Sequence, residues 1–247
     1  MAEPSGRRDV KNDSTPPVSI SVFFPCYNEQ DNVAKVAEQA IQVLEGLHAD
    51  YEVFIVDDGS SDKTGEVADR IAAANPRVRA IHHPCNRGYG AALQSGFRAA
   101  TKELVFYTDG DAQFDLNELP PLLELMKDFD IVSCYRMDRR DKPLRRLNGW
   151  LWTTMNNALF SLNVRDIDCA FKLFKREIFD KIAMESQGAL IATEILARAV
   201  RKGYTITQRG VHHYPRRAGQ ATGGNPKVIL RAFKEVIKLR KRIVSGR

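Results

Sequence analysis

Tyr107-Thr108-Asp109-Gly110-Asp111-Ala112-Gln113 is the stretch that says most about the fold and chemistry of this chain. An apolar run ends here in two carboxylates one residue apart, with an amide two residues further on. In an extended segment, Asp109, Asp111 and Gln113 point the same way and can present oxygens to one Mg²⁺ or Mn²⁺, while Gly110 lets the backbone turn. A cation held in this way typically grips a diphosphate. The isolated pattern is also compatible with a solvated Asp-Gly turn after an edge strand.

Length and composition indicate a globular protein with a substantial core. The chain has 247 residues, of which 43% are hydrophobic, enough for one large α/β domain or two small ones. Its formal net charge is +6, from 37 Lys and Arg against 31 Asp and Glu, and the basic excess lies at the termini and in the second half. This asymmetry favours an anionic partner. The four cysteines are far apart with no CxxC pair, so we expect reduced thiols rather than a zinc site or disulfides.

The start of the chain bears on where the protein works. Residues 1–17 are charged, contain Ser and Pro, and lack the apolar core of a signal peptide, so we predict a disordered leader. No apolar stretch approaches the roughly 20 residues that span a bilayer. We therefore expect a cytoplasmic protein, with one domain over residues 18–225 and a separate helix over residues 226–247.

Apolar strands and amphipathic helices alternate in the first half of the chain. The first predicted strand stops at Pro25, and the second leads into Asp57-Asp58-Gly59-Ser60. The predicted strands are residues 18–24, 52–56, 78–82 and 104–107, and the predicted helices are residues 33–44, 64–74 and 90–100. Strands separated by helices of this length predict an α/β fold of parallel βαβ units with helices on both faces of the sheet.

The acids at the predicted strand ends should lie together, because open α/β sheets bind ligands at the carboxyl ends of their strands. One nucleotide site can therefore use Asp58, Asp109 and Asp111. A Rossmann dinucleotide fold is disfavoured, since the turn Pro25-Cys26-Tyr27-Asn28-Glu29 has no glycine and puts an acid where pyrophosphate would sit. The later turn, Asn86-Arg87-Gly88-Tyr89-Gly90, lacks the Lys-Ser/Thr of a P-loop and is equally compatible with a glycine turn that begins a helix.

Several motifs follow one another in an order typical of one enzyme family. They are Phe24-Pro25-Cys26-Tyr27-Asn28-Glu29, Val56-Asp57-Asp58-Gly59-Ser60, Arg87-Gly88-Tyr89-Gly90, Asp109-Gly110-Asp111-Ala112-Gln113, Ser133-Cys134-Tyr135-Arg136 and Asp166-Ile167-Asp168-Cys169-Ala170-Phe171. In this order the chain resembles family 2 glycosyltransferases with a GT-A fold, and most closely the polyprenol-phosphate (dolichol-phosphate type) mannosyl- and glucosyltransferases. The resemblance runs from about Val18 to Gly223. It implies a mostly parallel central sheet with a Rossmann-like nucleotide-binding half.

The resemblance also implies roles for individual residues. Asp111 and Gln113 would be the metal ligands proper, Asp109 would face the ribose or the metal, and Asp57 would support its loop. The catalytic candidates are Asp111, Arg136 and Arg216. The candidates for nucleotide-sugar binding are Pro25, Tyr27, Glu29, Val56, Asp57, Asp58, Arg87, Asp109, Gly110, Asp111, Gln113 and Arg216.

The need for a cation follows from the chemistry alone. Breaking the bond between the anomeric carbon and the diphosphate builds negative charge on the leaving oxygen. A cation beside the diphosphate lowers that barrier by several kcal/mol. Removal of Asp111 is therefore expected to damage turnover severely.

The segment Arg216 to Gly223 resembles a family loop in which an arginine, a glycine and a terminal lysine close over the phosphates. Arg216 and Gly219 fit this pattern, whereas Thr222 stands where the lysine is expected and Ala221 where a serine is usual. Part of the phosphate grip is therefore missing or is supplied by Arg217. Adjacent guanidinium groups suit bidentate phosphate binding, although a solvated basic loop is also compatible with these residues.

The nature of the acceptor decides whether a general base is needed. A lipid phosphate is already anionic at neutral pH, so no proton has to be removed from it. A sugar hydroxyl would need a nearby carboxylate, and the candidates are Glu194, on an otherwise apolar helical segment, and Asp168. Glu194 is equally compatible with a structural hydrogen-bonding role. The predicted acceptor side consists of these two acids together with Arg136 and Arg217.

The C-terminal segment has the pattern of a basic amphipathic helix. Its apolar residues are Ile229, Leu230, Phe233, Val236, Ile237, Ile243 and Val244, and its basic residues are Lys227, Arg231, Lys234, Lys238, Arg240, Lys241 and Arg242. Such a helix can lie on an anionic membrane, at about 1 kcal/mol per basic residue near the surface. Alternatively, it packs its apolar face on the domain. Trp150 and Trp152, which follow a second basic run, fit either an interfacial or a core position.

These observations favour an inverting, Mg²⁺- or Mn²⁺-dependent glycosyltransferase that moves a hexose from a GDP- or UDP-sugar to a polyprenyl phosphate. It would work peripherally at the cytosolic membrane face, with a membrane-anchoring subunit as a candidate partner. The alternatives are the same fold acting on a sugar hydroxyl, with Glu194 or Asp168 as the base, and a nucleotide-sugar-binding module without catalysis. A nucleic-acid binder is disfavoured, because the basic residues are not interleaved with aromatic residues on strands.

Overall fold

The computed structural model describes residues 17–137, 143–216 and 226–245, with the side chains of residues 144–145 and 226–234 left out of the description. Apart from Pro17, the predicted leader lies outside the described residues. Arg217 and the rest of the predicted phosphate loop also lie outside them. For these residues the predictions above stay predictions.

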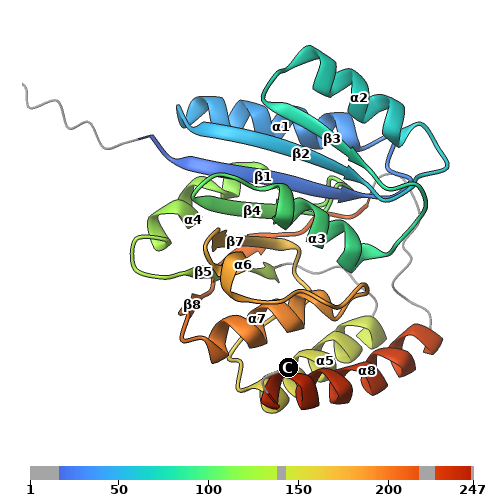
Figure 1. Cartoon of the computed structure of the whole chain (residues 1–247), viewed down its shortest axis with the longest axis vertical. Helices are drawn as coiled ribbons and strands as arrows, with labels where there is room; N and C mark the ends of the chain where they lie inside the picture. Colours follow the sequence, from blue (N-terminus) through green and yellow to red (C-terminus); the bar gives the residue numbers. More distant parts are fainter. Residues whose placement is uncertain (1–16, 138–142, 217–225, 246–247) are drawn as a thin grey trace, which may run out of the picture.

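A seven-stranded sheet forms the centre of the molecule (Figure 1). Its strands, in spatial order, are β3 (Val78–His82), β2 (Asp50–Asp57), β1 (Ser19–Cys26), β4 (Leu104–Thr108), β7 (Phe171–Lys175), β5 (Ile131–Ser133) and β8 (Ile206–Thr207). The first four strands are parallel, β7 runs antiparallel to both of its neighbours, and β8 is parallel to β5. The sheet is therefore mostly parallel, as the alternation of the sequence predicts.

The parallel half is built from βαβ units. Its helices are α1 (Val33–Gly46), α2 (Thr64–Ala74) and α3 (Tyr89–Ala99). Because crossovers between parallel strands are right-handed, α1 and α2, which lead outward along the sheet, share one face. The return connection through α3 covers the other face, where α3 packs on β1, β2 and α7 (Ile191–Arg201). Helices on both faces leave the carboxyl ends of β1, β2 and β4 open at one edge.

The second half adds smaller elements around this sheet. They are η1 (Leu116–Glu118), α4 (Pro120–Leu125), α6 (Ile178–Lys181), α5 (Pro143–Phe160), α8 (Pro226–Val244) and a two-stranded parallel sheet of β6 (Tyr135–Met137) and β9 (Gly210–His212). Helices α5 and α8 pack side by side at the end of the molecule opposite α2 (Figure 1). In the described parts of the chain, no helix combines the length and the apolar character that crossing a bilayer requires.

An aromatic cluster fastens α3 to the sheet and so fixes the start of that helix. The ring of Phe97 packs edge-on against Phe23 at 4.8 Å and against Tyr107 at 5.6 Å between ring centroids. Gly96 is required here, since a Cβ at that position would lie 2.2 Å from the Phe23 ring. All three rings are buried, and the residue at the other end of α3, Tyr89, is thereby held at the open edge of the sheet.

One predicted boundary is wrong. We predict a strand that stops at Pro25, but β1 continues through Pro25 to Cys26. The registered pairing of β1 with β4 ends at Phe23, so the proline lies where the strand has already left that neighbour. A missing N–H is tolerated at such a position. The extension carries Cys26 to the level of Asp57 on β2, at the edge where the candidate site lies.

Candidate active site

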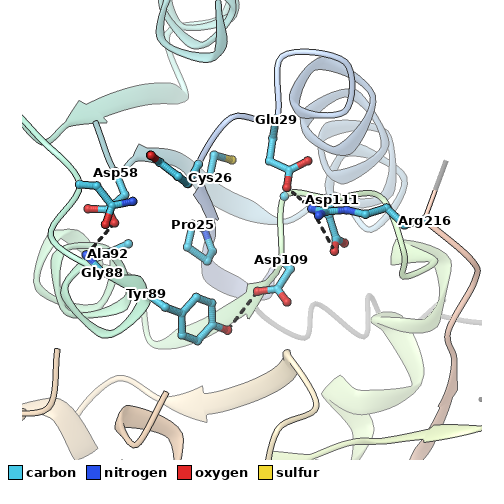
Figure 2. A pocket seen from close by; sticks show the side chains of 13 residues that line it. Pro25, Cys26, Glu29, Asp58, Gly88, Tyr89, Ala92, Asp109, Asp111 and Arg216 are labelled. Atoms are coloured by element: carbon cyan, nitrogen blue, oxygen red, sulfur yellow. Dashed lines mark hydrogen bonds and ion pairs between the residues drawn. The ribbon is translucent and has the colours of Figure 1, made fainter. Parts of the chain in front are cut away.

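A cavity of about 370 Å³ opens at the carboxyl edge of the parallel strands. It is lined by Pro25, Cys26, Tyr27, Glu29, Asp58, Asn86, Gly88, Tyr89, Ala92, Asp109, Gly110, Asp111 and Arg216 (Figure 2). The lining comes from the ends of β1, β2 and β4, from the start of α3, and from the segment after β9. The structure thus brings together most of the residues for which we predicted nucleotide-sugar binding.

Asp109 and Asp111 stand at the centre of this cavity. Asp109 follows β4 and accepts a hydrogen bond of 3.0 Å from the hydroxyl of Tyr89 (Figure 2). Asp111 accepts the backbone N–H of Gln113 at 3.1 Å and lies 3.6 Å from the guanidinium of Arg216. Burial raises the pKa of Asp109 to about 7, with repulsion from Asp111 adding to the shift. Burial likewise raises the pKa of Asp111.

The turn between the two carboxylates is shaped by its neighbours. Gly110 passes so close to β1 that a Cβ there would lie 2.4 Å from the Cys26 sulfur, and its N–H donates to the Pro25 carbonyl. Ala112 adopts a left-handed conformation with φ 58°, which bends the chain after Asp111. The turn therefore brings both carboxylates of the motif to the cavity.

The donors present fit a hard divalent cation. The carboxylates of Asp109 and Asp111 face the same cavity and repel each other. Asp109 accepts a hydrogen bond from the neutral hydroxyl of Tyr89, and Asp111 lies beside the guanidinium of Arg216, which it shares with another acid. Mg²⁺ usually takes one or two protein carboxylates and completes its shell with substrate phosphates and water. Among the described residues, no group of three or more His, Cys, Asp or Glu side chains is arranged so that it could hold a metal ion.

Gln113 lies outside the cavity lining, although its spacing from Asp109 and Asp111 predicts a place beside them. Its side-chain nitrogen donates a 2.8 Å hydrogen bond to the carbonyl of Tyr214, and Gln113 does not line the cavity. The contact ties the metal motif to the segment that carries Arg216. Its role as a third metal ligand stays a prediction.

The burial of Asp109, together with repulsion from Asp111, leads to a prediction about stability. The pKa of Asp109 is near 7 in the fold and near 4 in an unfolded chain, so the folded state holds an extra proton between these values. The contribution of Asp109 to stability therefore falls as the pH rises from about 4 to about 7. In chelator at pH 8, Asp109→Asn should raise Tm by on the order of 5 °C relative to the native chain, measured by calorimetry. The difference should shrink toward pH 4.

The control for this experiment is Asp128→Asn, which removes an exposed carboxylate and should leave Tm unchanged at both pH values. An Asp109→Asn protein that melts below the native chain in chelator at pH 8 would show that the two carboxylates do not destabilise each other.

Arg216 links two acids that lie in the segments after β1 and after β4. Its guanidinium donates to the carboxylate of Glu29 and lies beside that of Asp111 (Figure 2). Glu29 also accepts a 2.7 Å hydrogen bond from the Asn32 side chain, and burial raises its pKa. Arg216 therefore places a delocalised positive charge at the rim of a cavity otherwise surrounded by carboxylates.

Asp57 and Asp58 hold loops through hydrogen bonds from backbone N–H groups. Asp57 accepts the N–H of Ser60 at 3.0 Å and pairs with His82. Asp58 lines the cavity, but Arg87 N–H and Gly88 N–H already donate to its two oxygens, at 3.0 and 2.8 Å. The buried His83 lies 2.6 Å from the same carboxylate. Both oxygens of Asp58 are thus engaged in fixing the turn before α3.

Four residues predicted to bind the nucleotide sugar do not line the cavity: Asp57 and Gln113, described above, and Val56 and Arg87. Val56 is wholly buried in β2, so its side chain packs in the core and only its backbone is near the sheet edge. Arg87 is exposed, and the contact that the structure gives it runs from its backbone to Asp58. Nucleotide binding at these two positions stays a prediction.

On the other side of Asp109 lies a group of buried charges. Arg136 makes a two-pronged ion pair with Asp166, at 2.6 and 2.8 Å, which holds the pKa of Arg136 above its usual range although burial opposes it. Asp168, two residues further along the chain, is exposed to solvent. Neither Arg136 nor Asp168 lines the cavity, but the charges of Arg136 and Lys172 are close enough to lower the pKa of Asp109.

Glu194 does not have the access that a general base requires. It is fully buried in α7, and one of its oxygens accepts the N–H groups of Glu185 and Ser186 at 3.1 and 2.7 Å. The other oxygen accepts from the Arg198 guanidinium at 3.0 Å. With both oxygens engaged and no place in the cavity lining, Glu194 takes the structural role that its sequence also allowed.

Sequence reasoning missed five residues of the lining. They are Cys26, Asn86, Gly88, Tyr89 and Ala92. A signal for Tyr89 was present, because glycines on both sides of a large polar side chain indicate a backbone that passes close to something else. Gly88, with φ 96°, adopts a conformation that favours glycine.

Comparisons with known proteins agree with this geometry. The model of the family "Glycosyl transferase family 2" matches residues 21–183. Glycosyltransferase AglD of Haloferax volcanii is 31% identical over 87% of this chain and 36% of its own length. The undecaprenyl-phosphate 4-deoxy-4-formamido-L-arabinose transferase of Edwardsiella ictaluri is 29% identical over 85% of this chain and 64% of its own length. The chain therefore spans between about a third and two thirds of these curated relatives.

A solved structure shows the same fold. Glucosyl-3-phosphoglycerate synthase from Mycobacterium tuberculosis, in complex with Mn²⁺, UDP and glucosyl-3-phosphoglycerate, superimposes with a TM-score of 0.64. The alignment covers 92% of this chain and 77% of the synthase, at 19% sequence identity. The same enzyme has been solved with Mg²⁺ and UDP, again with a TM-score of 0.64.

Proposed function

The chain belongs to glycosyl transferase family 2 and has the GT-A fold. From this premise we propose that it is an inverting, metal-dependent glycosyltransferase that moves a hexose from a nucleotide diphosphate sugar to a polyprenyl phosphate. The observation that carries the proposal is the convergence of Asp109, Asp111 and Arg216 in one cavity at the carboxyl edge of the sheet. An acidic pair beside a guanidinium suits a diphosphate that arrives with a divalent cation.

The donor end of the cavity has groups for both halves of a nucleotide sugar. Asp109 and Asp111 would hold Mg²⁺ or Mn²⁺, which when bound supplies Lewis-acid stabilisation of the departing diphosphate. Arg216 would add a positive charge on the same side. Tyr27 is 41% exposed at the cavity rim and offers an aromatic face for the base, with Glu29 beside it. The solved relatives that contain UDP with Mn²⁺ or Mg²⁺ support this assignment at the level of the fold.

The proposed acceptor is an anionic lipid phosphate. A phosphate oxygen is a nucleophile at neutral pH, so the reaction needs no general base. The burial of Glu194 away from the cavity supports this choice over a sugar hydroxyl. The relative from Edwardsiella ictaluri, named as an undecaprenyl-phosphate sugar transferase, supports the same acceptor class. Arg136 and Asp168, on the far side of Asp109, would face the acceptor half of the site together with Arg217.

The surface made by α5 and α8 supports work at a membrane. The apolar face of α8 is divided: Val236, Leu239 and Ile243 are buried against the domain, whereas Ile237 and Val244 are exposed. Of the two alternatives that the sequence left open, packing on the domain applies to part of the described apolar face, which contacts α7 and Phe160. Among the side chains that the structure describes in α5 and α8, the exposed large apolar ones are Leu147, Trp150, Leu151, Ile237 and Val244. The exposed basic side chains Lys238, Arg240 and Lys241 lie on α8.

Binding to anionic vesicles should depend on this surface. Each basic residue near an anionic surface contributes about 1 kcal/mol, so Lys238→Gln with Lys241→Gln should weaken binding to vesicles containing phosphatidylglycerol by about 10- to 30-fold. Trp150, which is 61% exposed, should show a blue shift of its emission on binding. Co-sedimentation and fluorescence measure the two effects.

The matched control changes two exposed basic residues near α2, Lys63→Gln with Arg70→Gln, at the opposite end of the molecule (Figure 1). If both double variants lose affinity equally, the interaction is a general charge effect and the α5–α8 surface is not the membrane-binding face.

The proposed function is tested by product formation. Purified protein is incubated with a panel of GDP- and UDP-hexoses, Mn²⁺ and a short polyprenyl phosphate, and glycolipid is scored by mass. We expect a glycosyl phosphate lipid with one donor. Product formed only with a sugar acceptor would reassign the acceptor, and nucleotide binding without any product would indicate a binding module instead of an enzyme.

A further inference from the structure

We infer that Glu194 is a positioning residue for the donor site, acting through the loop at residues 185–188 and the turn Gly88-Tyr89-Gly90. The contacts themselves are independent of the proposed function; only the interpretation of the cavity at Asp109 and Asp111 as a donor site rests on it. The chain of contacts runs from a buried carboxylate in α7, through two backbone segments, to the hydroxyl that meets Asp109. Each link is a hydrogen bond or a close backbone approach.

The first link fixes the loop. Glu194 is fully buried, and one oxygen accepts both the Glu185 N–H, at 3.1 Å, and the Ser186 N–H, at 2.7 Å. Its other oxygen accepts from Arg198, one turn along α7, which fixes the orientation of the carboxylate. A charged acceptor with two backbone donors is a strong restraint in a buried place. The Glu194 carboxylate therefore holds the backbone of the loop before α7, while the side chain of Glu185 in the same loop pairs with Arg198 and Arg242.

The second link joins the loop to the turn. The Gln187 carbonyl accepts the N–H of Gly90 at 2.8 Å, and the Ser186 carbonyl accepts from the Gln94 side chain at 2.9 Å. A Cβ at Gly90 would lie 2.4 Å from the Ser186 carbonyl oxygen, and one at Gly88 would lie 2.8 Å from that of Gln187. The two backbones touch in a way that only glycine permits, so a shift of the loop moves the turn.

The third link reaches the cavity. Asp58 restrains the same turn from the opposite side by accepting hydrogen bonds from the N–H groups of Arg87 and Gly88. Between these two restraints stands Tyr89, which lines the cavity and donates to Asp109 at 3.0 Å (Figure 2). This bond engages one oxygen of Asp109 and sets the direction of the other. Misplacement of such a group by about 1 Å is enough to change ligand binding and turnover substantially.

Glu194→Gln tests this restraint specifically, because a glutamine amide has only one acceptor oxygen where the carboxylate has two. Both oxygens of Glu194 face donors, so an amide must turn its NH₂ group either toward the loop N–H groups or toward Arg198. Adding Arg198→Met removes the second set of donors and lets the amide oxygen face the loop. The double variant should therefore recover what Glu194→Gln loses, a result that general destabilisation does not produce.

Two readouts that need no sugar donor test the inference in the full chain. Hydrogen exchange should show at least tenfold faster exchange of the Gly90 amide in Glu194→Gln, with recovery when Arg198→Met is added. Mn²⁺ titration followed by electron paramagnetic resonance should show about tenfold weaker binding in Glu194→Gln and about threefold to tenfold weaker binding in Tyr89→Phe. Combining Glu194→Gln with Tyr89→Phe should add little, because both act on Asp109 through the same hydroxyl.

The matched control is Glu52→Gln. Glu52 is also a buried glutamate that accepts a backbone N–H, from Thr101, and pairs with an arginine, but it lies at the opposite end of β2 from Asp57. This variant should lower Tm and leave Mn²⁺ affinity and Gly90 exchange unchanged. If Glu194→Gln fails to fold, the same two measurements are made on Gln94→Leu, with the same expected directions. This substitution removes the contact with Ser186 and also the hydrogen bond that Gln94 accepts from Arg98 within α3.

Native Mn²⁺ affinity and native Gly90 protection in a folded Glu194→Gln protein would overturn the inference. If the native chain binds no Mn²⁺, hydrogen exchange of the Gly90 amide is the deciding measurement. Unchanged protection of that amide in Glu194→Gln then overturns the inference. This test can be told apart from the test of the proposed function. If the chain forms no glycolipid but Glu194→Gln changes Mn²⁺ affinity and Gly90 exchange, the proposed activity is wrong and the positioning role of Glu194 stands.

Discussion

Replacement of Asp111 by asparagine should lower turnover by about three orders of magnitude. The substitution keeps the shape of the side chain and removes one of the two cavity carboxylates that we propose to hold the cation. A cation beside the departing diphosphate contributes several kcal/mol, and about 4 kcal/mol corresponds to a thousandfold in rate. Because that stabilisation is greatest when the bond breaks, kcat should fall more than the affinity for the nucleotide sugar.

Steady-state kinetics with saturating Mn²⁺ measure this effect. The control, Asp69→Asn, removes an exposed carboxylate of α2 that pairs with His82, and it should retain native turnover. An Asp111→Asn protein that keeps more than a tenth of native kcat would mean that this carboxylate does not serve the chemical step.

Replacement of Arg216 by methionine should lower kcat/KM by about a hundredfold, the size of effect seen when one preorganised donor to a developing anion is removed. Arg216 donates to Glu29 and lies 3.6 Å from Asp111, so its loss leaves two carboxylates facing an anionic substrate. Adding Glu29→Gln removes one of these charges and should restore part of the loss. Arg216→Lys should rescue poorly, because an ammonium group lacks the planar fork that reaches two acids.

The control for Arg216 is Arg79→Met, which breaks an ion pair with Glu52 and involves a side chain that is 57% exposed. It should leave kcat/KM unchanged. If Glu29→Gln worsens the Arg216→Met protein, then Glu29 makes its own contact with substrate, and charge balance around Arg216 does not explain the loss.

The parallel half of the fold was predictable because short-range sequence patterns specify its strands and helices. The helix over residues 64–74 and the strand over residues 78–82 are confirmed to the residue as α2 and β3. Continuous apolar strands alternate there with helical periodicity, and the acids that end β2 and β4 meet at one edge because parallel strands share a direction. The convergence of Asp58, Asp109 and Asp111 in one cavity follows from that rule.

The rest depends on contacts between distant parts of the chain. Nothing local in residues 171–175 shows that β7 inserts antiparallel between β4 and β5. Likewise, an acid on an apolar helix looks the same whether it faces a substrate or a loop, and only the structure places Glu194 under the N–H groups of Glu185 and Ser186. The divided apolar face of α8 is a third case, since periodicity identifies apolar residues without saying which of them the domain covers.

The central claim is that Asp109 and Asp111 hold the divalent cation on which sugar transfer depends. The most direct measurement is glycolipid formation from the reactive donor in chelator, followed by titration with Mn²⁺, for the native chain and for Asp111→Asn. The account predicts no product in chelator, full recovery of the native enzyme at micromolar to millimolar Mn²⁺, and no recovery of the variant in that range. Transfer at the native rate in chelator, or equal recovery of both proteins, would contradict it.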